Sequence, residues 1–317
     1  MAAESAPGAG ERTGEKTAVL LMGYGSPRGP EDLPGFLREV LGGREPPAEM
    51  VREYHRRYDL IGWSPQPRVT ESLRGKLEKR LRLRDPDARV LLATKHWAPH
   101  IAEAIPEAVE GGVRRVVAIP LSPFASPWVL RPYEQAIAEG RKRAKRPVSV
   151  ELRAGWHLSP ALAKAWARSI ERTLAEVPGD RFTFLTAHSL PKRQEEAHDP
   201  YPRLVQETAG RVAQAARLDP WEFTYQSAGN TTEPWLGPDV TERMVHQAER
   251  GHRDQLVAPI GFVFDHLETL YDLDEVVRTF AEKHGIRYHR VPLPNDDDLL
   301  VEALEGVATA PLWTPGA

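Results

Sequence analysis

Short apolar runs rich in Val, Leu and Ile recur along this 317-residue chain, and helical patterns lie between most of them. Runs of this kind predict strands at Ala18–Met22, Arg89–Ala93, Val113–Ile119, Val148–Leu152, Phe182–Ala187, Glu222–Tyr225, Gln255–Pro259 and Arg287–Val291. The patterns between them predict helices at Pro67–Arg82, His100–Glu110, Pro132–Lys145, Ala161–Glu176, Pro202–Ala216, Val240–Arg250, Glu275–His284 and Leu299–Val307. Strands that alternate with helices predict an α/β fold with parallel sheets covered on both faces.

The length suggests two domains, each with a mostly parallel four-stranded sheet. We expect a flexible tail at 1–16, which is rich in Ala, Gly and Glu. The first domain is predicted at 17–156 and the second at 157–317, with the last helix free to pack back on the first domain. The break between the sheets is expected near Ala154–Ser159.

Composition excludes several classes of protein. The chain has no cysteine, which excludes disulfide scaffolds, thiolate zinc sites and cysteine-ligated iron–sulfur clusters. A net charge of −3 does not indicate the basic charge that is typical of nucleic-acid-binding proteins. The longest apolar-rich stretch, Val116–Leu130, is interrupted by three prolines, so no stable membrane insertion is expected. These features predict a cytoplasmic protein.

Two segments at predicted strand ends carry groups that could do chemistry. After the first strand, Tyr24 lies between Gly23 and Gly25 in a G-x-G-x-x-x-G spacing, which differs from the dinucleotide fingerprint. Tyr24 is either a packed turn aromatic or a phenol at the mouth of the sheet. After the fifth strand, His188 could accept a proton, bind a metal or be purely structural. The chain has no G-x-S-x-G elbow, so a Ser-His hydrolase is not indicated.

A third segment, after the seventh strand, is apolar and then strongly acidic. Helical spacing places Glu268 and Asp272 on one face, where carboxylates and His266 could bind a divalent cation. Acidic residues that complement a helix dipole would give the same pattern.

A fourth segment, 226–239, predicts a stiff loop with Trp235 as an apolar wall. His96 and His100 have an H-x-x-x-H spacing that lacks the glutamate of a zinc protease.

Together these segments resemble the ferrochelatase family. The similar motifs cover nearly the whole chain after the tail and comprise Gly23-Tyr24-Gly25-Ser26-Pro27, Arg57-Tyr58-Asp59-Leu60-Ile61-Gly62, Lys95-His96-Trp97, Ala187-His188-Ser189-Leu190-Pro191, Asp199-Pro200-Tyr201-Pro202, Gln226-Ser227-Ala228-Gly229-Asn230-Thr231, Pro234-Trp235-Leu236-Gly237-Pro238-Asp239 and Asp265-His266-Leu267-Glu268-Thr269-Leu270-Tyr271-Asp272. The resemblance implies two Rossmann-like, doubly wound domains of the class II chelatase kind, with a porphyrin cleft between them. It also implies insertion of ferrous iron into a porphyrin, which belongs to haem biosynthesis.

The resemblance assigns roles to particular residues. It implies that His188 and Glu268 are the catalytic pair and bind the incoming Fe²⁺. It implies that Tyr24 is an axial ligand of the product iron, as in the branch of the family that uses coproporphyrin III, so coproporphyrin III is the expected substrate. Further porphyrin contacts are expected at Arg57, Tyr58, Ser64, Tyr133 and Trp235. Fe²⁺ is then a substrate, and neither a tightly bound cofactor nor an iron–sulfur cluster is expected.

Some residues depart from the family pattern, and other functions stay open. Leu41 stands where the coproporphyrin branch often has an arginine, Phe124 replaces a histidine, and Val276 replaces an acid beyond Asp272. The alternatives are a protoporphyrin IX ferrochelatase, a cobalt or nickel chelatase for a sirohydrochlorin-type tetrapyrrole, and a non-catalytic porphyrin or haem carrier. The family suggests a monomer that makes at most transient contact with neighbouring enzymes of the haem pathway.

Overall fold

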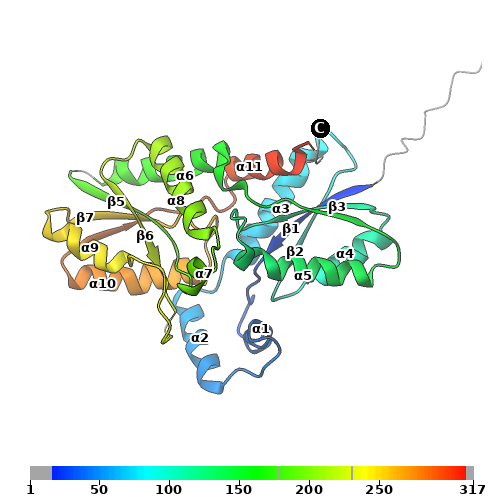
Figure 1. The fold of residues 1–317 in the computed structure, drawn as a ribbon, viewed down its shortest axis with the longest axis horizontal. Helices are drawn as coiled ribbons and strands as arrows, with labels where there is room; N and C mark the ends of the chain where they lie inside the picture. Colours follow the sequence, from blue (N-terminus) through cyan, green and yellow to red (C-terminus); the bar gives the residue numbers. More distant parts are fainter. Residues whose placement is uncertain (1–15, 178, 230, 312–317) are drawn as a thin grey trace, which may run out of the picture.

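The computed structural model describes residues 16–177, 179–229 and 231–311, and it contains two four-stranded, all-parallel sheets (Figure 1). The first sheet consists of β1 (Thr17–Gly23), β2 (Arg89–Thr94), β3 (Arg115–Pro120) and β4 (Ser149–Leu152). The second consists of β5 (Arg181–His188), β6 (Trp221–Gln226), β7 (Asp254–Ala258) and β8 (Arg287–Arg290). All eight predicted strands are present, and the predicted α/β class with two parallel sheets is confirmed. Of the predicted tail, only Lys16 lies within the described residues.

Both sheets have the same topology. Their strand orders are β2-β1-β3-β4 and β6-β5-β7-β8, so each chain half begins on an inner strand, adds one neighbour on one side and then crosses to the other side. In such doubly wound sheets a crevice opens beyond the carboxyl ends of the strands where the order reverses. These switch points lie between β1 and β3 and between β5 and β7.

The eight predicted helices are also present, with ends shifted by a few residues. They correspond to α3 (Gln66–Arg82), α4 (Ile101–Glu110), α5 (Pro127–Arg143), α6 (Pro160–Glu176), α8 (Tyr201–Ala216), α9 (Val240–Glu249), α10 (Arg278–Lys283) and α11 (Asp298–Thr309). The sequence analysis did not predict α1 (Leu33–Val40), α2 (Ala48–Leu60), the short α7 (Arg193–Glu196) or the 3₁₀ turn η1 (Trp156–Leu158). The segment η2 (Glu268–Val277) is a π-helix that runs directly into α10. None of the helices within the described ranges is long and apolar enough to cross a bilayer.

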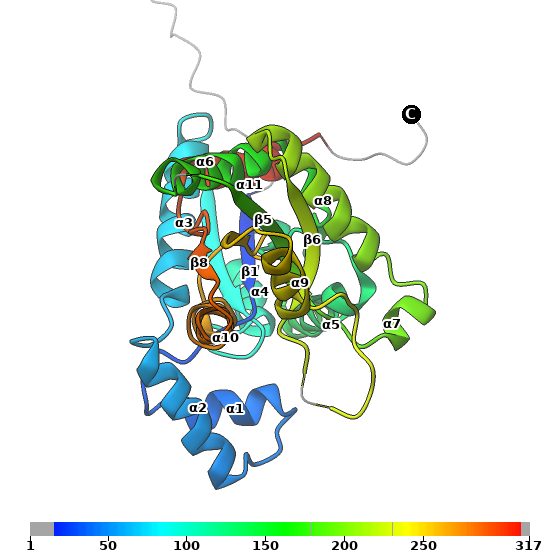
Figure 2. The ribbon, with the colours of Figure 1, turned by 90° about the vertical axis from the view of Figure 1, so that its left-hand side faces the viewer.

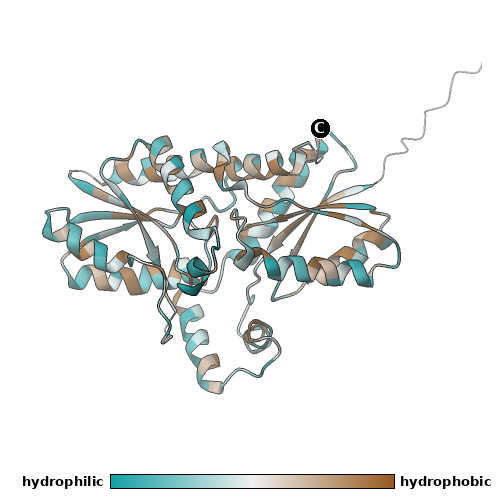
Figure 3. Cartoon of the chain, in the orientation of Figure 1, coloured by the Kyte–Doolittle hydropathy of each residue, from teal (hydrophilic) through white to brown (hydrophobic). Residues whose placement is uncertain are grey.

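Strand alternation divides the core into layers. On β1, Leu20 and Met22 face a cluster formed with α4 and α5, whereas Leu21 faces the opposite cluster with α3. The cluster around Leu21 continues through α11, α6 and α8 to residues of β5 and β7, so one apolar core spans both halves. The buried strands accordingly form the hydrophobic centre of each half (Figure 3).

Two segments connect the halves on opposite sides. Helix α11 packs on both α3 and α6, along the upper edge of the molecule in Figure 1. On the other side α1 and α2 project as a separate pair, and α2 contacts η2 of the second half. This pair has its own small core around Phe36, Leu37 and Tyr58, against which Leu267 of the second half packs.

Candidate active site

His188 and Glu268 meet at the carboxyl edge of the second sheet. The Nε2 atom of His188 lies 3.7 Å from a carboxylate oxygen of Glu268, and the two side chains are 26% and 45% exposed. His188 is the last residue of β5, and Glu268 begins η2 after the loop that follows β7. The two residues expected to form the catalytic pair are therefore brought together at the β5–β7 switch point, open to solvent.

The backbone around His188 fixes the tautomer of its ring. Nδ1 contacts the carbonyl oxygen of Ser189, which can only accept, so Nδ1 carries the proton and donates it. The Nε2 of the neutral ring therefore keeps its lone pair, which can take a proton or bind a metal. The hydroxyl of Tyr201 donates to the His188 carbonyl at 3.0 Å and holds the strand end in place.

A buried polar network positions the start of η2. The Asp265 carboxylate accepts from Arg290 Nη1 at 2.9 Å and from Asn295 Nδ2 at 2.8 Å. The backbone N–H of Glu268 donates to Nδ1 of His266 at 3.2 Å, and burial lowers the pKa of His266. Because Arg290 also pairs with Asp274 at 2.7 Å, it ties Asp265, three residues before η2, to the second turn of that helix. The sequence analysis gave no role to Arg290 or Asn295, which lie far along the chain.

Tyr24 lies at the corresponding edge of the first sheet. It follows β1 directly, and 47% of its surface is exposed. Its ring centroid lies 4.5 Å from that of His96, and Lys95 Nζ lies 5.5 Å from the ring centroid. The desolvation of the phenol, together with the negative charge of Glu268, raises the pKa of Tyr24. Tyr24 and Glu268 therefore lie within electrostatic range of one another, although they come from different halves.

The other predicted porphyrin contacts lie in different surroundings. Tyr58 is buried, stacks on Trp63 at 5.3 Å between ring centroids, and belongs to the small α1–α2 core. Ser64 accepts from the Gln66 backbone N–H at 3.3 Å, as a residue at a helix start does. Tyr133 is only 6% exposed and packs in the core between the first sheet and α5.

Trp235 and Phe262 form the apolar sides of the His188 ring. Their ring centroids each lie 6.4 Å from that of His188. The Trp235 ring lies so close to Gly229 that a Cβ there would overlap its six-membered ring, and its Nε1 donates to Thr231 at 2.8 Å. A flat apolar wall beside an imidazole and a carboxylate suits a flat aromatic ligand whose centre is polar.

Arg57 reaches the site from α2. Its Nε donates to Glu53 at 2.8 Å, and its guanidinium lies 4.9 Å from the centroid of the Tyr271 ring. Burial raises the pKa of Asp272, the charge of Glu268 raises it further, and the charge of Arg57 lowers it. Arg57, Asp272 and Glu268 thus share one electrostatic environment.

The remaining candidate ligands form no metal centre. No group of three or more His, Asp or Glu side chains within the described residues is arranged to hold a metal ion. His100 pairs with Glu39 at 2.8 Å, whereas His96 packs on Tyr24, so the H-x-x-x-H pair points to different partners. Phe124 is 1% exposed and packs edge-on against Tyr201, so it serves the core rather than a ligand.

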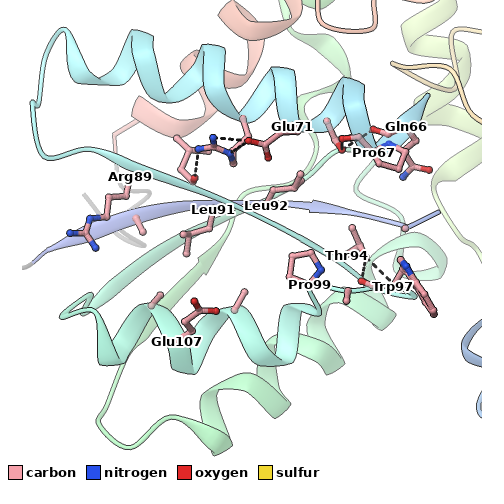
Figure 4. Close-up of a pocket in the computed structure, with 18 of the residues that line it drawn as sticks. Gln66, Pro67, Glu71, Arg89, Leu91, Leu92, Thr94, Trp97, Pro99 and Glu107 are labelled. Atoms are coloured by element: carbon pink, nitrogen blue, oxygen red, sulfur yellow. Dashed lines mark hydrogen bonds and ion pairs between the residues drawn. The ribbon is translucent and has the colours of Figure 1, made fainter. Parts of the chain in front are cut away.

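A groove on the first half lies away from this pair. It has a volume of about 1090 Å³ and follows the outer edge of β2 between α3 and α4, with Leu91, Leu92 and Pro99 in its wall (Figure 4). One end reaches Gly25 and Ser26 behind the Tyr24 turn, but neither His188 nor Glu268 lines it. The chemistry of the residues, rather than the size of the groove, therefore identifies the site.

Known proteins resemble this chain in sequence. The sequence matches the family model for ferrochelatase over residues 16–311. It is 35% identical over 311 residues to the ferrochelatase of Thermus thermophilus, and the aligned region covers 92% of this chain and 98% of the relative. It is also 35% identical over 303 residues to the coproporphyrin III ferrochelatase of Geobacillus kaustophilus, and this alignment covers 92% of this chain and 95% of the relative.

Solved structures confirm the fold. SirB from Bacillus subtilis with Fe3+ superposes with a TM-score of 0.60 at 14% identity, covering 93% of this chain and 96% of SirB. CbiX, described as the terminal enzyme for biosynthesis of siroheme in denitrifying bacteria, superposes with a TM-score of 0.56 at 14% identity and covers 93% of this chain and 99% of its own. With the sequence match over nearly all the described residues, this chain belongs to the ferrochelatase family, whose members insert a metal ion into a porphyrin.

Proposed function

We propose that this enzyme inserts ferrous iron into coproporphyrin III and releases two protons. The observation that carries the proposal is the 3.7 Å approach of His188 to Glu268 within electrostatic range of Tyr24. Metallation requires a base for the pyrrole N–H groups and ligands that replace the water around Fe²⁺. A neutral imidazole and a carboxylate serve both needs.

The two edges of the cleft suit different parts of the reaction. His188 and Glu268 act from one side, where they remove the pyrrole protons or pass the iron inward. Tyr24 acts from the other side, where its oxygen binds the iron after insertion. Trp235 and Phe262 hold the ring, and a ring held out of plane exposes its nitrogen lone pairs to the metal.

Two features support coproporphyrin III as the substrate. Tyr24 is the residue that the coproporphyrin-using branch carries in this glycine turn, and a relative at 35% identity is named a coproporphyrin III ferrochelatase. A tetracarboxylate also requires cations at the rim of the cleft, and Arg57 offers a planar guanidinium there. We expect a monomer that acts in the cytoplasm and has no resident cofactor.

An anaerobic steady-state assay tests the proposal. Fe²⁺ is supplied with coproporphyrin III or with protoporphyrin IX, and kcat/KM is expected to be higher for coproporphyrin III. The reverse order would identify a protoporphyrin enzyme. Faster insertion of Co²⁺ or Ni²⁺ into a sirohydrochlorin-type ring would identify the other chelatase, and tight porphyrin binding without metallation would identify a carrier.

A further inference from the structure

Tyr271, on the helix that carries Glu268, makes one of the contacts between the two halves of the molecule. Arg56 of α2 donates from Nη2 to the hydroxyl of Tyr271 at 2.8 Å. The next residue, Arg57, lies over the same ring, with its Cζ 4.9 Å from the ring centroid. In Figure 2, α2 lies below the helix that continues from η2 into α10. Tyr271 therefore fixes α2 of the first half against η2 of the second.

The Arg57 guanidinium is held but retains hydrogen-bonding capacity. Its Cζ lies 4.9 Å from the centroid of the Tyr271 ring and 5.3 Å from that of the Tyr54 ring, and Glu53 accepts from its Nε. Among the described residues no hydrogen bond engages its two terminal nitrogens, and 32% of the side chain is exposed. A guanidinium oriented by aromatic rings, with free terminal N–H groups, is suited to bind a carboxylate through two parallel bonds.

The position of Arg57 relates it to the reacting centre. Its charge acts on the Asp272 carboxylate, which follows Tyr271 in the chain and shares η2 with Glu268. A carboxylate on the rim of a bound ring that meets Arg57 would thereby be set at a fixed distance from Glu268. Tyr271 links the two, because it is the residue of η2 whose ring Arg57 contacts.

We propose that Tyr271 is a positioning residue that holds Arg57 where it receives a carboxylate of the macrocycle, and so sets how the ring lies over His188 and Glu268. This inference rests on the proposed function, since it assumes a ring with carboxylates at its rim. The ring of Tyr271 orients Arg57, and its hydroxyl anchors Arg56. These two contributions can be separated by substitution.

A double-mutant cycle on porphyrin binding tests the inference. Tyr271→Leu removes the ring and is expected to raise the Kd and the KM for coproporphyrin III about fivefold while kcat stays within about twofold. Tyr271→Phe keeps the ring and is expected to bind porphyrin as the wild type does. Arg57→Met should weaken binding by at least as much as Tyr271→Leu, and the double variant should be no weaker than Arg57→Met alone.

The Kd is measured by quenching of porphyrin fluorescence without metal, so it stays informative even if the enzyme fails to metallate coproporphyrin III. Val276→Ala, an exposed truncation on the same helix, should leave binding unchanged. Additive losses in the cycle, or an unchanged Kd in Tyr271→Leu, would overturn the positioning role. A fall in the melting temperature of Tyr271→Leu that accompanies a lower kcat at constant KM would show a purely structural role.

Discussion

Gly261 lies directly against Ala187, so that a Cβ added to Gly261 would stand 2.7 Å from both the Cα and the Cβ of Ala187. Ala187 precedes His188 on β5, and Gly261 belongs to the loop that leads from β7 to Glu268. The backbone N–H of Gly261 also donates to the carbonyl of Thr186 at 3.0 Å. This close approach of two backbones brings the His188 and Glu268 segments together.

Gly261→Ala should therefore separate the catalytic pair. Because both atoms in the way belong to residue 187 of a buried strand, the loop must shift, and we expect a loss of about 1–3 kcal/mol in the free energy of unfolding. The metallation kcat should fall about tenfold from the misplaced pair. Urea unfolding and the anaerobic assay measure the two effects. Gly210→Ala on α8, with no neighbour within 4 Å, is the control and should be neutral or stabilising.

His188→Ala should abolish most iron insertion and leave porphyrin binding largely intact. The Nε2 atom of His188 lies 3.7 Å from the Glu268 carboxylate, and loss of a general base costs about 10²–10⁴ in kcat. Single-turnover metallation and a porphyrin titration distinguish the two effects. His284→Ala, an exposed histidine at the end of α10, serves as the control. Normal turnover by His188→Ala would contradict the assignment.

Tyr24→Phe should change the ligation of the product iron more than the rate of insertion. The substitution removes the phenol oxygen but keeps the ring that packs on His96. We expect kcat within about fivefold of the wild type and the loss of the phenolate-to-iron charge-transfer band in the ferric product complex. The absorption spectrum of each complex measures this. An identical spectrum for both proteins would show that Tyr24 does not bind the iron.

Stability should fall as the pH falls from 6.5 to 4, in part because of His96. Burial, with the nearby charge of Lys95, lowers the pKa of His96 to about 4, so in this range the unfolded chain takes up a proton there that the folded protein does not. The contribution is complete above pH 6.5 and is lost toward pH 4. After allowance for partial exposure we expect it to be about 1 kcal/mol. Urea unfolding of His96→Gln should show a correspondingly weaker pH dependence, and equal slopes would refute this.

Strands such as β1, β3 and β5 could be predicted because they are buried, largely apolar runs. The pairing of His188 with Glu268 also followed in outline, since both come after strands whose carboxyl ends share one edge. The order of the strands in each sheet cannot be predicted from hydrophobic periodicity, because the sequence of one strand does not indicate which strands lie beside it. Both sheets nevertheless repeat one order.

Other elements lacked a readable signal. Helix α1 contains Pro34 and Gly35, and α2 is strongly polar, so neither matched the pattern of a core helix. The π-helix η2 has i→i+5 bonding, which a 3.6-residue period cannot indicate. The contact of Arg57 with Tyr271 and the hydrogen bond of Arg290 to Asp265 join distant parts of the chain. No local sequence pattern predicts either of them.

Helix α11 has a mechanical consequence for how a flat molecule could enter. Leu300 and Leu304 of α11 belong to the apolar cluster that runs from α3 through α6 to α8. Rotating the two halves apart would therefore expose this shared core to water. The α1–α2 pair has only a small core of its own and meets the second half through Tyr271 and Leu267. Displacing α1 and α2 exposes far less apolar surface than separating the halves would. A flat ligand therefore reaches His188 and Glu268 at lower cost from the side opposite α11.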